Sequence, residues 1–257
     1  MTQLQIILLL VLSLFVNILH AENETIVIGA DIWCPVNCEP NSDHPGYMIE
    51  IAEKIFKDKT IKVEYRVMPW ARAIFEAEKG KIHAIVGAFK GEAPHFIYPQ
   101  EELGLIGNSF FTHVYNLWHF QGVDSLESII LATIKGYDYG DTVNQYVSNK
   151  EYASNIVEIT GNKNVLSRSM SMLIANRVDV IVESDVVFWY QAKKENLIDS
   201  VKFAGQASAP RKVYIAFAPN SEMSKKYAKI LSDGVVNLRA SGELEKIMSK
   251  YGLQDWQ

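Results

Sequence analysis

Hydrophobic and polar residues change their period several times along the first part of the chain. Thr25–Ala30 is rich in β-branched residues and Ile61–Val67 alternates, so both segments predict β-strands. Between them, apolar residues recur within residues 48–56 at the spacing of one helix face. A second helix is predicted over Ala71–Lys79 and a buried strand over Ile82–Ala88. This β-α-β-α-β order predicts a parallel sheet with helices on its faces.

The pattern then breaks and begins again. Residues 96–119 are aromatic and extended, without a helical period. After them the sequence predicts a second α/β unit, with its elements at Ser125–Ile129 (turn or short helix), Ile130–Ile134, Thr142–Ser148, Ile156–Ile159, Asn164–Asn176, Val178–Val182 and Val186–Lys194. A last strand at Val213–Phe217 is followed by helices at Ser224–Ala240 and Gly242–Tyr251. No flexible linker divides the units, so we expect two α/β lobes that meet across a cleft.

The N-terminal residues predict export. The apolar run Ile6–Leu19 is short for a membrane span and long enough for the core of a signal peptide. Ala21 supplies the small residue of a cleavage site, so we expect residues 1–21 to be removed and the mature protein to be periplasmic. The alternative is an uncleaved membrane anchor.

Composition and charge exclude several classes of protein. The 257 residues are 48% hydrophobic and 21% charged, which is typical of a soluble globular protein. The net charge of -5 comes without any basic block, so nucleic acid is not an expected partner. The sequence has no Gly-rich phosphate loop, nucleophile elbow or H-E-x-x-H motif, and no two histidines share a metal-ligand spacing on one helix. We therefore expect a protein that is not an enzyme and has no metal or cofactor.

Two cysteines, Cys34 and Cys38, are the only ones in the chain. In an oxidising compartment two thiols this close usually pair, so we favour a disulfide that stiffens the loop. Two free thiols are an alternative. A metal site is another, although only His44 lies near enough in sequence to add a ligand.

Candidate binding residues follow the predicted strands. In open α/β sheets, ligands bind outside the carboxyl ends of the strands. The residues selected on this ground are Asp31, Trp33, Trp70, Arg72, Gly87, Ala88, Phe89, Lys90, Lys135, Tyr137, Glu183 and Asp185.

Several of these residues also have ordinary structural explanations. Trp33 could cover the cysteine turn, and Trp70 could cap the second helix or pack in the core. Asp31 could accept hydrogen bonds in a turn, whereas Arg72 and Lys135 could be solvated surface residues. Of Tyr137 and Tyr139, and of Glu183 and Asp185, we expect only one each to face the cleft.

Four segments carry a resemblance to a known family. They are "GYMIEIAEKIF", "PWARAIFEAEKGKIHAIVGA", "LIANRVDVIVESD" and, as the most specific, "LRASGELEKIMSKYGL". The likeness extends over nearly the whole mature chain, which resembles the bacterial extracellular solute-binding proteins of family 3, the polar-amino-acid binding proteins of ABC importers.

The resemblance implies a type II-like periplasmic-binding-protein fold with two α/β lobes and a two-strand hinge. The implied lobes are residues 22–108 with 212–257, and 109–211, with hinges near 106–112 and 207–213. Arg211 and Lys212 lie at the return hinge, where contacts between the lobes are the alternative to contacts with ligand.

The chain departs from the family at the carboxylate clamp. In the amino-acid binders an arginine soon after the third strand, within a Thr-x-x-x-x-Arg stretch, holds the ligand's α-carboxylate. Here the stretch reads "AFKGEAPHFIYP", without threonine or arginine; Lys90 and His95 are its nearest basic groups. Arg72, at a helix start, is the expected substitute, and we expect it, with Lys90 and Lys135, to meet the ligand's negative end.

The other candidates complete the expected site. Asp31, Glu183 and Asp185 would meet the positive end of a zwitterionic or anionic solute, and the tryptophans would wall its apolar part. The backbone of residues 87–89 would add directional hydrogen bonds.

The expected function is that of a monomeric periplasmic solute-binding protein. It would capture a small polar solute, amino-acid-like or a small organic anion, by hinge closure and deliver it to an ABC permease. A ligand sensor that presents the solute to a membrane receptor is one alternative. A dehydratase-like enzyme on the same fold is another.

Overall fold

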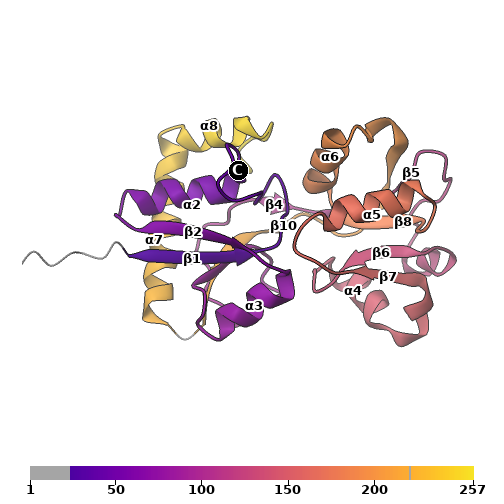
Figure 1. The fold of residues 1–257 in the computed structure, drawn as a ribbon, viewed down its shortest axis with the longest axis horizontal. Helices are drawn as coiled ribbons and strands as arrows, with labels where there is room; N and C mark the ends of the chain where they lie inside the picture. Colours follow the sequence, from indigo (N-terminus) through magenta and orange to yellow (C-terminus); the bar gives the residue numbers. More distant parts are fainter. Residues whose placement is uncertain (1–23, 220) are drawn as a thin grey trace, which may run out of the picture.

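The computed structural model describes residues 24–219 and 221–257, which form two α/β lobes (Figure 1). Each lobe has its own β-sheet, as the two predicted α/β units require. The predicted signal peptide, residues 1–21, lies outside the described residues. Within the described ranges, no helix is both long and apolar enough to cross a membrane.

The first lobe contains a four-stranded sheet of order β11-β3-β1-β2. Its elements from the first part of the chain are β1 (Thr25–Ala30), α2 (Tyr47–Lys57), β2 (Lys62–Val67), α3 (Trp70–Glu78) and β3 (Ala84–Ala88). From the end of the chain it takes β11 (Tyr214–Phe217), α7 (Glu222–Ala240) and α8 (Glu243–Lys250). β1 lies parallel to β2 and β3, so the carboxyl ends of these three strands share one edge of the sheet.

The second lobe contains a five-stranded sheet of order β7-β6-β8-β5-β9. Its elements are β5 (Asn108–His113), η1 (Val123–Ser128), β6 (Leu131–Ile134), α4 (Asp141–Ser148), η2 (Lys150–Asn155), β7 (Ile156–Ile159), α5 (Val165–Ile174), β8 (Val180–Ser184), α6 (Asp185–Lys194), η3 (Ile198–Ser200) and β9 (Val201–Gln206). β6 is parallel to β7 and β8, whereas β5 is antiparallel to β8 and β9.

Two short strands cross between the lobes side by side. β4 (Leu105–Ile106) and β10 (Arg211–Lys212) form an antiparallel pair in which Ile106 faces Arg211. Figure 1 shows this pair in the middle of the molecule, between the two sheets. The two connections therefore form one ribbon.

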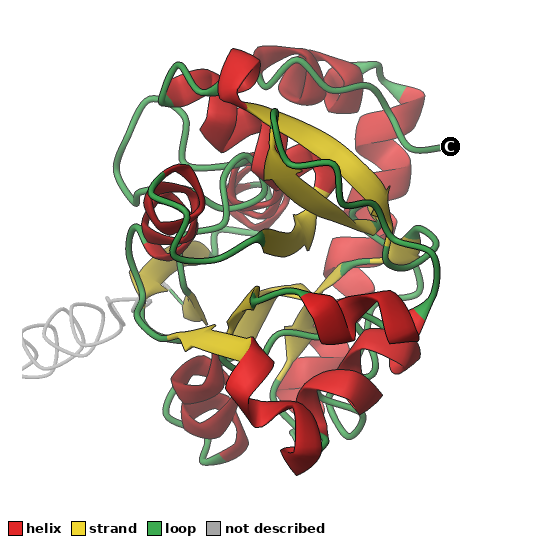
Figure 2. Cartoon of the chain, turned by 90° about the vertical axis from the view of Figure 1, so that its right-hand side faces the viewer, coloured by secondary structure: helices red, strands yellow, loops and turns green. Residues whose placement is uncertain are grey.

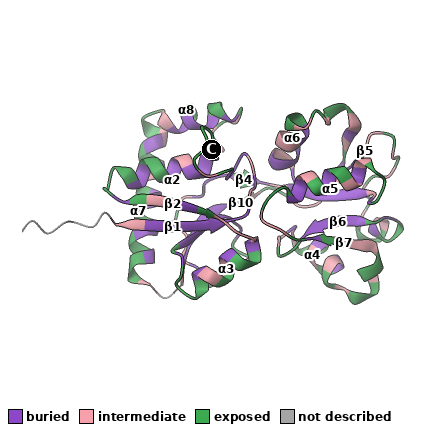
Figure 3. Cartoon of the chain, in the orientation of Figure 1, coloured by how far each residue is buried: buried purple, intermediate pink, exposed green. Residues whose placement is uncertain are grey.

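Strand alternation divides the core into faces. Phe111 stacks on Phe188 of α6 with ring centroids 3.7 Å apart, whereas its neighbour Phe110 contacts Trp118 on the other face of the sheet. Helices lie on both sides of the strands (Figure 2), and buried residues follow the strands and the inner helix faces (Figure 3).

Three differences from the sequence prediction concern the strands. β3 begins at Ala84 instead of Ile82, and β8 runs over Val180–Ser184 instead of 178–182. The sequence did not predict β9, whose run VKFAGQ contains a glycine and a half-exposed phenylalanine. Pairing with β5 holds both β8 and β9 in place, and this long-range contact is not encoded in local periodicity.

Candidate functional site

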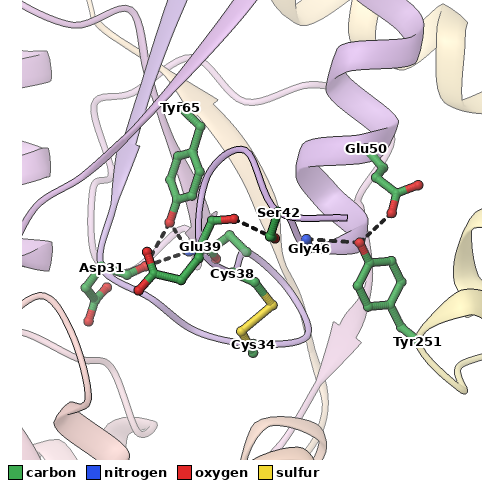
Figure 4. The surroundings of a disulfide bond; sticks show 10 residues. Asp31, Cys34, Cys38, Glu39, Ser42, Gly46, Glu50, Tyr65 and Tyr251 are labelled. Atoms are coloured by element: carbon green, nitrogen blue, oxygen red, sulfur yellow. Dashed lines mark hydrogen bonds between the residues drawn. A yellow bond between two sulfur atoms is a disulfide. The ribbon is translucent and has the colours of Figure 1, made fainter. Parts of the chain in front are cut away.

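The loop after β1 is a compact, covalently closed structure (Figure 4). Cys34 and Cys38 form a disulfide with their Cα atoms 4.8 Å apart, as we favoured from the sequence. Beside it, the backbone N–H groups of Trp33 and Asn37 each donate to the other's carbonyl oxygen, at 2.8 and 3.2 Å. The bridge and the disulfide together fix the direction of the Trp33 side chain.

A second set of contacts ties this loop to the body of the first lobe. The Asn37 side-chain amide donates to the Asp31 carbonyl oxygen at 2.6 Å and to the Tyr65 hydroxyl at 2.9 Å. At the far end of the loop, the Gly46 N–H donates to the Tyr251 hydroxyl at 3.0 Å, which itself donates to Glu50 (Figure 4). Both ends of the loop are therefore anchored before α2 begins.

A small cavity lies where this loop meets the second lobe. It is lined by Asp31, Trp33, Asn37, Trp70, Val86, Gly87, Phe89, Glu92, Asn108, Tyr137 and Asp138. Its volume is about 20 Å³, room for about one water molecule.

Aromatic side chains form the walls of the cavity. The Trp33 ring meets the rings of Phe89 and Tyr137 edge-on, with centroids 6.3 Å away in each case. Gly87 has a positive φ of 87°, and a Cβ atom there would lie 3.2 Å from the Trp33 ring. A glycine at this position lets the indole lie against the end of β3.

Asp31 follows β1 directly and is 3% exposed. The Tyr137 hydroxyl of the second lobe donates to its Oδ2 at 2.7 Å. Burial raises the pKa of Asp31 to about 7, although the hydrogen bond from Tyr137 acts in the opposite direction. The carboxyl is therefore both a contact between the lobes and a proton acceptor near neutral pH.

Glu183 is the second buried carboxyl, at the end of β8. Its Oε1 accepts from Trp33 Nε1 at 2.9 Å and from the Ser184 N–H at 2.8 Å. Its Oε2 has no partner within the described residues. Burial raises the pKa of Glu183 to about 7. It lies behind Trp33, outside the lining of the cavity.

Glu92 is a third carboxyl at the contact between the lobes; it is partly buried, and we had not selected it from the sequence. Its Oε1 accepts from Trp70 Nε1 at 3.1 Å and from the Asp138 N–H of the second lobe at 3.2 Å, while Oε2 accepts from the Phe89 N–H at 2.8 Å. Burial raises the pKa of Glu92 to about 8. The one feature of the sequence that could have indicated Glu92 as a site residue is its position in the loop after β3.

Arg211 supplies the cation nearest to these acids. Its guanidinium donates to Asp138 Oδ2 at 2.6 Å and to the Asp138 carbonyl at 2.8 Å, and lies 4.3 Å from the centroid of the Phe89 ring. Burial acts to raise the pKa of Asp138, but hydrogen bonds from Arg211 and Gly140 hold it below its usual value. Asp138 is therefore already neutralised by Arg211.

The structure places the predicted basic residues elsewhere. Arg72 has 66% of its side chain exposed and pairs with Glu76 at 3.4 Å, and Lys135 has 61% exposed and pairs with Glu158. Lys90 lies over the rings of Tyr98 and Tyr214. None of the three lines the cavity.

The other selected residues divide in the same way. Asp31, Trp33, Trp70, Gly87, Phe89 and Tyr137 line the cavity together. Ala88 is buried in β3, and Asp185 begins α6 beside an outer groove. The sequence selection missed the lining residues Asn37, Val86, Glu92, Asn108 and Asp138.

Solved structures share this fold. No protein-family model and no curated protein matches the chain. A histidine kinase sensor domain with similarity to periplasmic binding proteins is 18% identical, with 91% of this chain and 99% of that one covered and a TM-score of 0.73. An ancestral arginine-binding protein bound to arginine is 19% identical, with 88% and 97% covered and a TM-score of 0.68.

A third structure comes from work on glutathione import through GshT and the cystine ABC importer of Streptococcus mutans. It is 17% identical, with 91% of this chain and 98% of that one covered and a TM-score of 0.74. Amino-acid ABC transporter substrate-binding proteins are also among the similar structures. At these identities the likeness shows the fold, which is the two-lobed periplasmic-binding-protein fold.

Asp31, Glu183 and Glu92 predict that the protein without a solute loses stability as the pH rises. Their pKa values are raised to about 7 in Asp31 and Glu183 and about 8 in Glu92. The unfolded chain ionises them near pH 4, so between these limits the folded state binds more protons. Their stabilising contribution is complete below about pH 4 and is lost as the pH passes about 8.

Calorimetric melting of the empty protein from about pH 5 to about pH 9 should show a falling melting temperature. The Asp31→Asn variant should show a shallower fall. A melting temperature that rises across this range would contradict the prediction.

Proposed function

We propose that this chain is a periplasmic solute-binding protein that captures a small polar solute in the cavity between its lobes. The observation that carries the proposal is a set of hydrogen bonds between the lobes at one cavity. They join Tyr137 to Asp31, Trp33 to Glu183 and the Asp138 N–H to Glu92. A solute that bonds to both lobes replaces such contacts, and the differential affinity draws the lobes together.

The similar structures support a binding role. One is an arginine-binding protein with arginine bound, and others are substrate-binding proteins of amino-acid ABC transporters. By analogy, the closed form of this chain delivers its solute to an ABC permease. A sensor role is the second candidate, because a histidine kinase sensor domain has the same fold.

A thermal-shift screen of the mature chain tests the proposal. A solute that binds only the folded state raises the melting temperature. The panel should contain amino acids, small peptides, organic acids and amines, and the bound compound should be recovered unchanged. Absence of any shift across all classes would contradict a binding function, and conversion of the compound would favour the enzyme alternative. Crosslinking of the loaded protein to a permease or to a receptor kinase separates importer from sensor.

Trp70→Ala should weaken the affinity for the solute at least about tenfold, or 1.4 kcal/mol. Trp70 is 4% exposed, lines the cavity and orients Glu92 through its indole N–H. Isothermal titration measures the loss. Trp189→Ala is the matched control, because Trp189 is 36% exposed and lies outside this cavity. If the two variants bind the solute with equal affinity, Trp70 contributes to packing and not to binding.

A further inference from the structure

We infer that the solute is a short organic diamine, a dication without a carboxylate, held between Asp31 at one end of the aromatic cavity and Glu92 at the other. This inference rests on the proposed function and names the class of solute. Its first support is the charge of the lining. Three of the eleven residues are acidic, namely Asp31, Glu92 and Asp138, and none is basic.

The acids at the cavity lack a matching cation. Arg211 neutralises Asp138, and Arg72 and Lys135 pair with glutamates outside the cavity. Asp31 and Glu92 therefore face the cavity with no basic side chain on the lining to pair with them. Buried charges in proteins are paired, because an isolated carboxylate loses its hydration. Burial raises the pKa of Asp31 to about 7 and that of Glu92 to about 8, and a dication bound between them would favour the ionised form of both.

Asp31 and Glu92 are hydrogen-bonded to different walls of the cavity. Asp31 accepts from Tyr137, and Glu92 accepts from the backbone of Phe89 and from the Trp70 indole. Trp33 contacts both the Tyr137 and the Phe89 ring. This arrangement puts an aromatic surface between two acidic groups, which suits a chain of methylenes with an ammonium at each end. Aromatic faces also attract ammonium groups directly.

An unused acceptor lies beside the Asp31 end. Asn37 is fully buried and lines the cavity, and its Oδ1 has no hydrogen-bond partner within the described residues. Its amide nitrogen is already committed to Asp31 and Tyr65, which fixes the oxygen as the available atom. An ammonium has three N–H donors, so it can serve both the Asp31 carboxylate and this oxygen.

A carboxylate on the solute finds no suitable partner here. A zwitterionic amino acid would bring its carboxylate near Asp31, Glu92 or Asp138. The guanidinium of Arg211 lies beside the cavity, and two of its nitrogens already donate to Asp138. Its Nε is buried and has no hydrogen-bond partner among the described residues, so it offers a single donor rather than the two-pronged contact that arginine makes with carboxylates.

Titration calorimetry of the mature protein tests the inference. The probes are 1,3-diaminopropane, 1,4-diaminobutane, 1,5-diaminopentane, n-butylamine and L-lysine. We expect at least one diamine to bind about tenfold or more tighter than n-butylamine and L-lysine. Binding near pH 7 should also release protons, seen as a heat that depends on the buffer, because both carboxyls ionise against the ligand.

Two variants that each remove a negative charge test where the two ammonium groups of the diamine bind. Asp31→Asn and Glu92→Gln should each weaken diamine binding about tenfold or more and reduce the preference over n-butylamine. Glu158→Gln removes an exposed acid of the second lobe and should leave both affinities unchanged. Melting of each variant checks that it folds; if one does not, the probe series on the unaltered protein still decides.

The outcomes separate this inference from the proposed function. Tighter binding of L-lysine or another amino acid than of every diamine would overturn the inference and leave the binding function in place, with Arg211 Nε as the carboxylate partner. Binding of none of the diamines would also overturn it. Only the absence of a shift across every class in the thermal screen would remove the binding function itself.

Discussion

Replacing Gly46 by alanine should lower the melting temperature of the empty protein by about 10 °C. Gly46 has φ of 105° and ψ of 141°, in a region that only glycine populates readily. A Cβ atom would lie 2.4 Å from the Asn37 Cα and 2.5 Å from the Val36 carbonyl oxygen. Backbone strain and overpacking each cost about 1–3 kcal/mol, and about 1 kcal/mol lowers the melting temperature of a domain this size by 2–4 °C.

Gly80→Ala is the matched control for this variant. Gly80 also has a positive φ, of 69°, but a Cβ atom there would meet nothing within 4 Å. It should therefore show only the cost of the backbone conformation, about 1–2 kcal/mol. Equal melting temperatures for the two variants would show that the loop around Gly46 adjusts and that its close packing does not matter for stability.

Trp33→Ala should destabilise the folded protein by about 3–5 kcal/mol, as large-to-small changes of buried tryptophan do. Trp33 is 7% exposed, packs against Phe89 and Tyr137, and bonds to Glu183 in the other lobe. The variant leaves a void between the lobes and takes one hydrogen-bond donor away from a buried carboxyl. Urea denaturation followed by circular dichroism measures the loss.

Trp33→Phe isolates the hydrogen bond from the packing. It keeps an aromatic ring and removes the N–H, so the buried Glu183 carboxyl loses one hydrogen-bond donor. The free energy of unfolding should therefore fall by about 1–3 kcal/mol. In a double-mutant cycle with Glu183→Ala, which removes the acceptor, the two changes should couple by at least about 0.5 kcal/mol. Additive effects would mean that the indole N–H of Trp33 contributes nothing through Glu183.

The two-lobed fold could be predicted from the sequence because its periodicities are local. β1 and α2 appear within a residue or two of their predicted positions. The end of β8 could not be predicted in this way, because the apolar run stops at Val182 whereas the pairing with β5 continues to Ser184. Glu183 therefore lies inside a strand, with its side chain fixed by the sheet, and not in the loop after it.

The cavity was predictable in part, for a similar reason. Trp33 and Trp70 follow strands whose carboxyl ends meet, and both line it. Arg72 follows the same strand as Trp70, but α3 buries Trp70, Ala73 and Ala77, and this helix face leaves Arg72 pointing outward. The end of a strand therefore predicted which residues lie near the cavity. Whether a side chain points into the cavity depended on the face of the helix that carries it.

Glu92 shows what local sequence omits altogether. It lies in an irregular loop, and its indole and second-lobe partners are 22 and 46 residues away. Only the folded chain brings these donors to one carboxyl. The same contacts add an acid to the cavity, whose lining contains no basic residue, whereas the sequence predicted both acidic and basic residues there.

The paired crossing strands make the second lobe an insert within the chain of the first. The chain leaves the first lobe at Ile106 and returns at Arg211, which face each other in one antiparallel pair. Opposed Cα atoms in such a pair are about 4.5–5.5 Å apart, a gap that a two-residue hairpin turn can close. A gene encoding the first lobe alone thus needs only that turn in place of the intervening segment. The same position can accept a fluorescent reporter with neighbouring termini, joined to the ribbon that connects the lobes.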